Sequence, residues 1–454
     1  MDIPPDYLQD ASGFRGFAER LFVPASEEKL VEVVREAARS ATPLTIAGGG
    51  TGITGGRVAR GGWVVSLEKL NGLEIRTGSA LAGAGVTLAD LHAAAERNGQ
   101  FYPPDPTETS AFLGGTIATN ASGSRSFRHG DTRRHVLALR VVLADGRTLA
   151  VRRGELVDFP IPALPLPRTT KHSAGFRLAP KMDWIDLFVG SEGTLGVIVE
   201  AEVRLLPAPK ELLAGVVFFP GDAGALDAVD AWRSCAGLRM IEYFDAGSLA
   251  LLRERFPDTP AAARAALLIE QELASPDDDE MDRWVDRLEE CGALADDSWF
   301  AVGAADRERF RRFRHALPEL VNDTVRRRGF LKVNSDYAVP VERNREMLGY
   351  YRERLESGFA GRYVIFGHIG DAHVHVNILP ASEEEFHRAG DLMLEFARKA
   401  VSMGGTVSAE HGLGKRKAHL LAIQYTPEEI EAMKDVKRRL DPHWLLGRGN
   451  LFGE

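Results

Sequence analysis

Cysteine is almost absent from this sequence, since Cys235 and Cys291 are the only two among 454 residues. A disulfide framework and a cysteine-ligated iron–sulfur cluster both need several cysteines at short spacings, so neither is expected. A reducing compartment is the simpler setting for two isolated thiols. Any iron–sulfur centre that serves this protein would have to belong to a partner.

Long hydrophobic runs and an excess of positive charge are also missing. No stretch approaches the ~18 apolar residues of a membrane span, and the first residues lack the basic and apolar regions of a signal peptide. The formal net charge is −9 and no basic stripe is visible, so nucleic acid is not expected as a partner. We expect a cytoplasmic protein without a transmembrane segment.

The chain does have the length and composition of a globular protein with more than one core. Its 454 residues are 44% hydrophobic and 27% charged, which is ordinary for globular proteins. Because single domains mostly stay below about 200 residues, two or three domains are expected. The stretch 207–210 has the composition of a boundary between them.

Histidines gather in two boxes near the C-terminus, GHIGDAHVH at 367–375 and AEHGLGK at 409–415. In a strand, His373 and His375 leave the same face, and a turn at 370–371 could fold His368 back opposite His375. With Glu410, two such imidazoles could bind a divalent transition metal and leave a position open for a substrate, while His411 serves as a base. Histidines satisfied within the core or at the surface are the alternative.

Glycine is plentiful in one segment, where six glycines fall within nine positions after the apolar run at 43–47. The missing Cβ atoms free several backbone N–H groups to face one anion. A GxGxxG spacing can be traced through Gly50, Gly52 and Gly55, but the strand-like stretch 63–67 follows it, and no clear helix does. A flexible turn is the alternative for this segment alone.

Two further segments have a similar character. YPPDPT at 102–107 precedes GGTIATNASG at 114–123, and GSEGTLG at 190–196 precedes a strand-like run at 197–205. Prolines stiffen an extended segment, and paired glycines let the backbone pass close to a flat ring or a pyrophosphate. We expect loops here, and several such loops suit a dinucleotide.

These blocks, in this order and with VLADG at 142–146 and the stretch 336–340, resemble a known family along nearly the whole chain. The family is that of the FAD-linked 2-hydroxyacid dehydrogenases of the vanillyl-alcohol-oxidase/p-cresol-methylhydroxylase (PCMH) superfamily. It includes glycolate oxidase large subunits, D-lactate dehydrogenases and D-2-hydroxyglutarate dehydrogenases.

The resemblance implies an α+β architecture of two domains. A PCMH-type FAD-binding domain would span residues 1–208, and a substrate and metal cap, an antiparallel sheet with helices, would span 209–440. Residues 441–454 would return to the FAD domain. Sequence patterns agree with this class: they predict helices at 27–39, 88–98 and 304–327, a hairpin at 140–149 and a strand at 332–339.

The cofactor implied by the resemblance is noncovalent FAD, since no histidine lies in the glycine segment where covalently flavinylated relatives carry one. The FAD contacts, carried over by position, come from the three loop regions and the C-terminal segment. They are Gly48, Gly49, Gly50, Thr51, Gly52, Pro104, Asp105, Thr107, Gly114, Gly115, Ala118, Thr119, Asn120, Gly123, Glu192, Gly193, Val197, Ile198 and Asn450.

The resemblance also implies roles for the histidine boxes. His368, His375 and Glu410 would hold a divalent metal, Zn or an ion similar to Mn or Fe, and His411 would be the general base beside the flavin. Oxidation of a 2-hydroxyacid requires removal of the hydroxyl proton, and a metal lowers the pKa of that hydroxyl. Substrate contacts are implied for Arg314, Lys332 and Asn377, although Arg314 also fits a solvated basic helix face.

The sequence departs from the family pattern at three places. Ala47 stands where an arginine often precedes the glycine loop, and 447–450 replace the usual Asn-Pro-Gly-Lys. His373 follows Ala372 where Gly-Asn is usual, so it could be a fourth metal ligand or a substrate contact. The histidines at 92, 129, 135 and 172 are assigned to structure.

The expected partners are a small 2-hydroxyacid, a separate electron acceptor (an iron–sulfur protein, a cytochrome, a quinone or an electron-transfer flavoprotein) and a second copy in a homodimer. Two other functions stay open. A metal-dependent hydrolase would use the histidine boxes but leaves the glycine loops unexplained. A non-catalytic FAD-binding subunit of a dehydrogenase complex would not need the intact histidine boxes.

Overall fold

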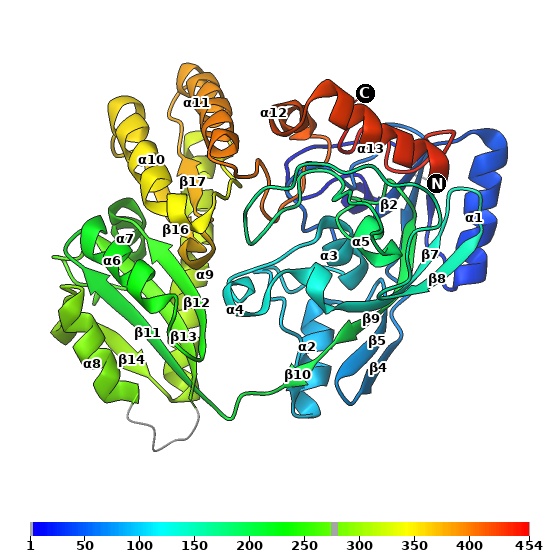
Figure 1. Ribbon diagram of the computed structural model, residues 1–454. Helices are drawn as coiled ribbons and strands as arrows, with labels where there is room; N and C mark the ends of the chain where they lie inside the picture. Colours follow the sequence, from blue (N-terminus) through cyan, green and yellow to red (C-terminus); the bar gives the residue numbers. More distant parts are fainter. Residues whose placement is uncertain (1–2, 274–279, 454) are drawn as a thin grey trace.

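Two antiparallel sheets form the centres of two lobes that lie side by side (Figure 1). The computed structural model describes residues 3–273 and 280–453. We call residues 3–207 together with 412–453 the N-terminal lobe, and residues 208–411 the cap lobe. None of the helices in these described ranges combines the length and the apolar character that a membrane crossing requires.

The N-terminal lobe contains a small parallel sheet and a larger antiparallel one. Helix α1 (Glu27–Ser40) packs Leu30, Val34 and Ala37 against the parallel sheet, in the strand order β1-β3-β2, and Ser26 caps its first turn. The antiparallel sheet has the order β4-β5-β9-β7-β8. The strands are β1 (Arg20–Phe22), β2 (Leu44–Ala47), β3 (Trp63–Ser66), β4 (Leu73–Arg76), β5 (Ser79–Gly83), β7 (Val136–Val142), β8 (Thr148–Arg152) and β9 (Val197–Arg204).

Short helices and the end of the chain complete this lobe. Helix α13 (Pro427–Leu440) and the C-terminal segment lie against it, since Lys437 donates to Thr194 O and Leu44 N donates to Leu445 O. Contact with this lobe therefore begins before residue 441. The helices are α2 (Leu88–Arg97), α3 (Leu113–Thr119), α4 (Ser126–His129), α5 (Trp184–Phe188) and α12 (Leu421–Gln424), and β6 (Gln100–Phe101) pairs with β10 (Leu206–Pro207).

The cap lobe is built on a seven-stranded sheet of order β14-β11-β13-β12-β16-β17-β15. Side chains alternate along β11, so that Val216 and Phe218 pack under α9 while Val217 and Phe219 pack under α6 and α8. The strands are β11 (Glu211–Phe219), β12 (Leu238–Phe244), β13 (Ala265–Leu273), β14 (Trp299–Ala301), β15 (Val333–Asn334), β16 (Tyr363–Gly367) and β17 (His375–Ile378).

Helices cover both faces of the cap sheet. The 25-residue helix α9 lies on one face with α7, and four helices lie on the other. Their bounds are α6 (Asp222–Trp232), α7 (Ala246–Leu252), α8 (Glu280–Glu290), α9 (Ala304–Arg328), α10 (Asn344–Phe359) and α11 (Glu383–Ser402).

The α+β class predicted from the sequence is confirmed, and so are the helices at 27–39, 88–98 and 304–327 and the hairpin at 140–149. Two local predictions are wrong. The loop expected at 114–123 begins as helix α3, because Gly114 lets this helix approach Ala84 so closely that a Cβ would lie 2.6 Å from its Cβ. Within the strand expected at 332–339, only Val333–Asn334 belong to a strand, Ser335 and Asp336 are buried, and Ala338 forms an isolated bridge with Thr406.

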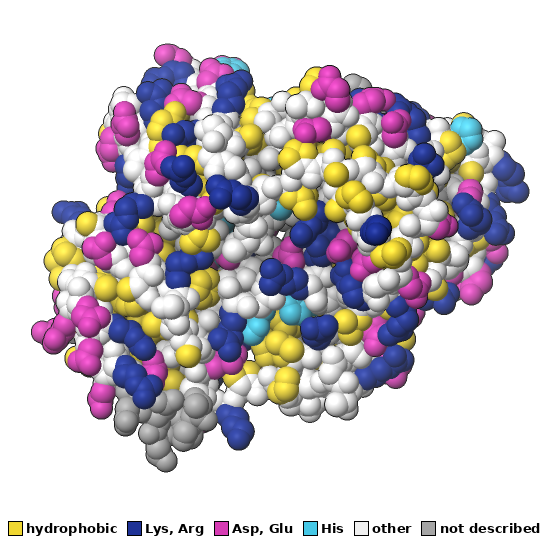
Figure 2. All heavy atoms as spheres, viewed as in Figure 1, with side chains coloured by type: hydrophobic (Ala, Val, Ile, Leu, Met, Phe, Trp, Pro, Cys, Tyr) yellow, Lys and Arg dark blue, Asp and Glu magenta, His cyan; other side chains and the backbone are white. Residues whose placement is uncertain are grey.

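A network of ion pairs joins the two lobes close to the start of α4. Arg125 of the N-terminal lobe lies 3.1 Å from Asp105 and 3.2 Å from Glu270 on β13. Glu270 also pairs with Arg239 on β12, whose guanidinium stacks 4.9 Å from the ring centre of Phe101. Figure 2 shows charged side chains of both signs along the hollow between the lobes on this face. Most of these groups are shielded from water, so their pairing should contribute to lobe association.

We predict that Arg125→Ala lowers the free energy of unfolding by about 2 to 3 kcal/mol, because Asp105 and Glu270 would lose a cation in a partly buried setting. Urea denaturation measures this. Arg438→Ala is the matched control, since Arg438 also pairs with two carboxylates but is 44% exposed, and it should cost no more than about 1 kcal/mol. Equal losses in both variants would contradict a role of the network in joining the lobes.

Candidate active site

A cavity of about 440 Å³ lies between the two lobes and receives residues from both. Its first half is lined by the glycine-rich segments of the N-terminal lobe. Its second half is lined by one face of the cap sheet, by α9 and by the loop that carries Glu410 and His411. The two groups of residues that the sequence singled out therefore meet in one space.

The glycine segments form a slot without side chains. A Cβ on Gly48 would lie 3.8 Å from the Cα of Gly115, whereas a Cβ on Gly115 would meet nothing within 4 Å. Two backbones from distant parts of the sequence thus face the same gap, which suits a flat ring or a pyrophosphate. This geometry fits the predicted dinucleotide.

Most of the predicted FAD contacts line the cavity, but three do not. Pro104 is buried, and Asp105 faces Arg125 in the network between the lobes. Asn120 ends α3 with φ +51° and uses its amide to bind Asp131 and the backbone of Arg133. For Asn120 the reason is local, since its backbone N–H caps α3 while its side chain joins the helix end to the segment 131–133.

Polar groups that the sequence did not single out also face this half of the cavity. Asp10 Oδ2, Arg57 Nε and Ser122 Oγ are buried without a hydrogen-bond partner among the described residues, and all three residues line the cavity. The Arg57 guanidinium donates to Gly48 O at 2.6 Å and to Asp6 O at 2.5 Å. Buried polar atoms rarely remain unpaired, so their place beside the glycine slot fits a polar ligand such as FAD.

The cap half of the cavity is one face of the sheet. Every second side chain of a strand points to this face, and residues directly opposite one another on neighbouring strands share it. The pairs on this face are Phe244 with Phe366, Phe366 with His375, and Asn334 with Asn377. Arg314 and Pro318 of α9 also line the cavity. They are four residues apart and therefore lie on the same face of the helix.

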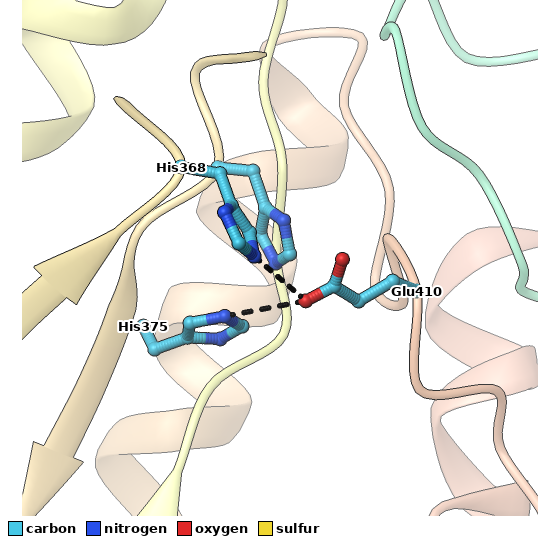
Figure 3. Close-up of side chains that lie close together, drawn as sticks. His368, His375 and Glu410 are labelled. Carbon is cyan, nitrogen blue, oxygen red and sulfur yellow. Dashed lines mark hydrogen bonds and ion pairs between the residues drawn. The ribbon is translucent and has the colours of Figure 1, made fainter. Parts of the chain in front are cut away.

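His368, His375 and Glu410 converge, as Figure 3 shows. The two histidines flank the β16–β17 turn, and Glu410 approaches from the opposite loop. Glu410 Oε1 lies 3.1 Å from His368 Nε2 and 3.4 Å from His375 Nε2. Ligands of a tetrahedral zinc ion, at bond lengths of about 2.0 to 2.1 Å, are about 3.4 Å apart. The donor atoms therefore fit a divalent metal.

Glu242, which the sequence analysis missed, connects this cluster to a predicted substrate contact. Its carboxylate lies 2.5 Å from His368 Nδ1 and accepts from Arg314 Nε at 2.8 Å. Burial, the largest effect, lowers the pKa of His368, but the charges of Glu242 and Glu410 together with the hydrogen bond to Glu242 outweigh it and raise the pKa overall. A carboxylate behind a metal-binding imidazole fixes the orientation of the ring. Strand β12 was not predicted, so its alternation could not point to Glu242.

Asp336 lies beside His411. This fully buried carboxylate accepts from the backbone N–H of His411 at 2.9 Å and from Ser408 Oγ at 2.7 Å. Its Oδ1 lies 3.3 Å from His411 Nδ1 and 3.1 Å from His373 Nε2. Burial lowers the pKa of His411 to about 3, with Lys417 adding to the effect. His411 is therefore neutral.

The remaining predicted contacts lie in the cap half. Arg314, Lys332 and Asn377 all line the cavity. Arg314 donates to Thr107 of the N-terminal lobe at 2.9 Å, and burial lowers the pKa of Lys332 to about 8. His373, which the sequence suggested as a fourth metal ligand, directs its Nε2 to Asp336. One ligand atom from each of His368, His373, His375 and Glu410 nevertheless lies within 4.8 Å of the others.

Glu192 couples a glycine segment to the loop that carries Glu410 and His411. It has φ +53° and accepts from Leu413 N at 2.7 Å and Gly414 N at 2.6 Å. Burial raises the pKa of Glu192 to about 7, against the opposing effect of the two amides and Lys415. The carboxyl thus holds the 408–415 loop at the cavity.

Two family profiles match the chain. One described as FAD binding domain matches residues 18–152, and one described as FAD linked oxidases, C-terminal domain, matches residues 208–451, which is more than half of the chain.

Curated relatives extend over almost the full length. A D-lactate dehydrogenase of Archaeoglobus fulgidus is 30% identical over 94% of this chain and 90% of its own. A D-2-hydroxyglutarate dehydrogenase of Xanthomonas citri pv. viticola is 30% identical over 95% and 88%. The glycolate oxidase subunit GlcD of Bacillus subtilis is 29% identical over 99% and 92%. A solved structure of alkyldihydroxyacetonephosphate synthase shares the fold, with a TM-score of 0.69 at 17% identity, over 94% of this chain and 75% of that chain.

We predict a pH-dependent stability difference between the wild type and Glu192→Gln. The ordinary pKa of the carboxyl is 4.5 and the folded value is about 7, so between these values the unfolded chain releases a proton that the folded protein keeps. The free energy of unfolding of the wild type should therefore fall by about 3 kcal/mol relative to that of the variant as the pH rises from 4.5 to 7.5. Urea denaturation at several pH values measures this, and a difference independent of pH would contradict it.

Proposed function

Because the chain belongs to the family of FAD-linked oxidases, we propose that it oxidises a D-2-hydroxyacid to the 2-oxoacid with FAD as cofactor, and that His411 removes the hydroxyl proton. Relatives named for D-lactate and D-2-hydroxyglutarate support this substrate class and the D configuration. The oxidation of 2-hydroxyacids by an FAD enzyme, expected from the sequence, is thus confirmed at the level of the class.

One observation carries the proposal: the glycine slot and the histidine cluster line a single cavity. A hydrolase would need only the second. A non-catalytic flavin subunit would need only the first, and here His368, His375, Glu410 and His411 are all present and mutually oriented. The arrangement favours an enzyme that brings a flavin and a small hydroxyacid together.

The residues that would hold the flavin are the glycine segments at 48–52 and 114–115, with Glu192 and Asn450 near the slot. When bound, FAD supplies an acceptor for the hydride that leaves the substrate carbon. Arg57 would add positive charge beside the slot, because its guanidinium lies against Gly48 O. This contact would stand in for the arginine that is missing at position 47.

The residues that would hold a divalent metal are His368, His375 and Glu410. Such an ion, when bound, lowers the pKa of a hydroxyl group beside it. His411 lies next to this cluster, with its ring stacked 5.2 Å from that of His375. Since its imidazole is neutral, it can take the hydroxyl proton, and Asp336 would stabilise the imidazolium that forms.

The substrate carboxylate would be bound by Arg314 and Lys332, with Asn377 as a further contact. The Arg314 guanidinium uses Nε for Glu242 and Nη1 for Thr107, so Nη2 remains to meet a carboxylate. Phe244, Phe366 and Pro318 give the same space an apolar wall.

We further propose that electrons leave through a separate acceptor, an iron–sulfur protein, a cytochrome, a quinone or an electron-transfer flavoprotein. One relative is named as a subunit of glycolate oxidase, and two isolated cysteines supply no cluster of their own. A homodimer remains part of this proposal.

The first test is anaerobic bleaching of the flavin by D- and L-lactate, glycolate, 2-hydroxyglutarate and malate. One D-acid should reduce the wild type fast. His411→Gln should slow this reduction by about 100- to 10,000-fold, because the proton acceptor is lost, with the flavin still bound. His387→Gln, a change at a histidine that is 73% exposed, should leave the rate unchanged.

Other results of this test point elsewhere. A yellow protein that no hydroxyacid reduces would favour the non-catalytic subunit, and a colourless protein that FAD cannot reconstitute would remove the proposal.

The second test is metal removal. Dialysis against a chelator should abolish reduction by the substrate, and one equivalent of Zn²⁺ or Mn²⁺ should restore it. The Glu410→Gln variant should bind the metal ion at least about 10-fold more weakly, since one charged ligand is lost. Glu383→Gln, a change at an exposed carboxylate on α11, serves as the control. Full activity of metal-free protein, verified by metal analysis, would contradict a catalytic ion.

A further inference from the structure

A lysine lies buried directly behind the predicted metal ligand Glu410. Lys171 belongs to the irregular stretch of the N-terminal lobe between β8 and α5, and its side chain is 0% exposed. Its Nζ donates to Glu410 Oε2 at 3.0 Å and to Gly123 O at 2.9 Å, and it lies 3.6 Å from Asp371 Oδ2. The three ammonium protons thus have three oxygens around them.

These contacts divide the two oxygens of Glu410 between the lobes. Oε1 faces His368 Nε2 and His375 Nε2 of the cap lobe, at 3.1 and 3.4 Å, whereas Oε2 is held by Lys171 of the N-terminal lobe. A buried ion pair fixes geometry because either partner alone would be an uncompensated charge. The carboxylate therefore cannot turn freely about its last bond.

Lys171 also reaches the turn that carries the two histidines. Asp371 lies between His368 and His375 in the sequence, and its Oδ2 accepts from Ser126 Oγ at 2.8 Å. The same hydroxyl lies 2.6 Å from Gly123 O, the carbonyl that Lys171 also binds, and its single proton can go to only one of these two oxygens at a time. One lysine thus joins the carboxylate ligand, the turn of the histidine ligands and the flavin loop at 114–123.

We propose that Lys171 is a positioning residue that keeps Glu410 monodentate toward the metal. The proposal rests on the metal site of the proposed function. With Oε2 engaged by Lys171, the protein offers one carboxylate oxygen and two imidazoles, and the other positions around the ion stay open for the hydroxyl and carboxylate of the substrate. Without Lys171, Oε2 would turn to the ion and fill one of these positions.

The test is the visible absorption of Co²⁺ bound in place of the native ion, because its intensity falls as the coordination number rises. In the FAD-containing protein, recorded as a difference spectrum against the metal-free protein, Lys171→Met should weaken these bands, as Glu410 becomes bidentate, and should change the metal affinity, measured against a competing chelator, by about 10-fold or more. Lys171→Arg, which keeps a donor and a charge, should restore most of the wild-type spectrum.

Lys437→Met is the matched control. Lys437 is also buried, at 1% exposure, and contacts Asp441, Thr194 O and Leu446 O, but it is not part of the metal cluster. Its variant should keep the wild-type Co²⁺ spectrum even if it loses stability. If Lys171→Met does not fold, Lys171→Gln, which can still donate to Gly123 O, takes its place with the same expectation.

Two outcomes would overturn the proposal, and they differ. If the wild type binds Co²⁺ and both Lys171→Met and Lys171→Gln keep its spectrum and affinity, the role of Lys171 falls while the metal site stands. If the wild type takes up no Co²⁺, or if Glu410→Gln binds it with an unchanged spectrum, the metal site falls and the role of Lys171 falls with it.

Discussion

The carboxylate of Glu410 is the point on which the two lobes and the chemistry of the cavity depend. It is shielded from water, and histidines of the cap lobe hold one oxygen while Lys171 of the N-terminal lobe holds the other. A buried carboxylate is stable only when each oxygen has a partner. The cluster therefore forms only where the lobes meet, which places it beside the glycine slot. The ion pairs of Arg125 and Arg239 maintain the same lobe arrangement from another side.

Burial also assigns the histidines their separate tasks. His368 has the Glu242 carboxylate behind it, and His411 and His373 share Asp336. In a site with little water, a carboxylate hydrogen-bonded to a ring nitrogen decides which nitrogen carries the proton and where the ring points, as Glu242 does for His368 and Asp336 does for His373. His368 thereby directs Nε2 to Glu410, whereas burial keeps His411 neutral beside it. Neighbouring imidazoles can thus differ in chemistry although they share one cavity.

The sequence predicted those parts of the site that lie in contiguous patterns. The sequence predicted that His368 and His375 lie close together because they flank one turn in a nine-residue box. It predicted the glycine segments from their composition. Contacts that depend on which way a side chain faces were harder to predict. Pro104, Asp105 and Asn120 belong to the segments that line the cavity but do not line it themselves. The sequence could not predict the roles of Glu242 and Lys171. Each is a single charged residue far along the chain from its partner, which is His368 for Glu242 and Glu410 for Lys171. The unpredicted strand β12 hid Glu242, because Arg239 and Glu242 interrupt its apolar pattern.

Arg57 illustrates why a departure from a family pattern does not by itself mean a lost interaction. Position 47 is alanine, and the strand that contains it is buried, so no cation reaches the slot from there. The chain places a guanidinium at the same loop from its other end, ten residues later, where it donates to Gly48 O and to the N-terminal turn at Asp6. An anion in the slot experiences the charge and its distance, whichever residue supplies it. A positive charge therefore lies beside the glycine loop although position 47 is alanine.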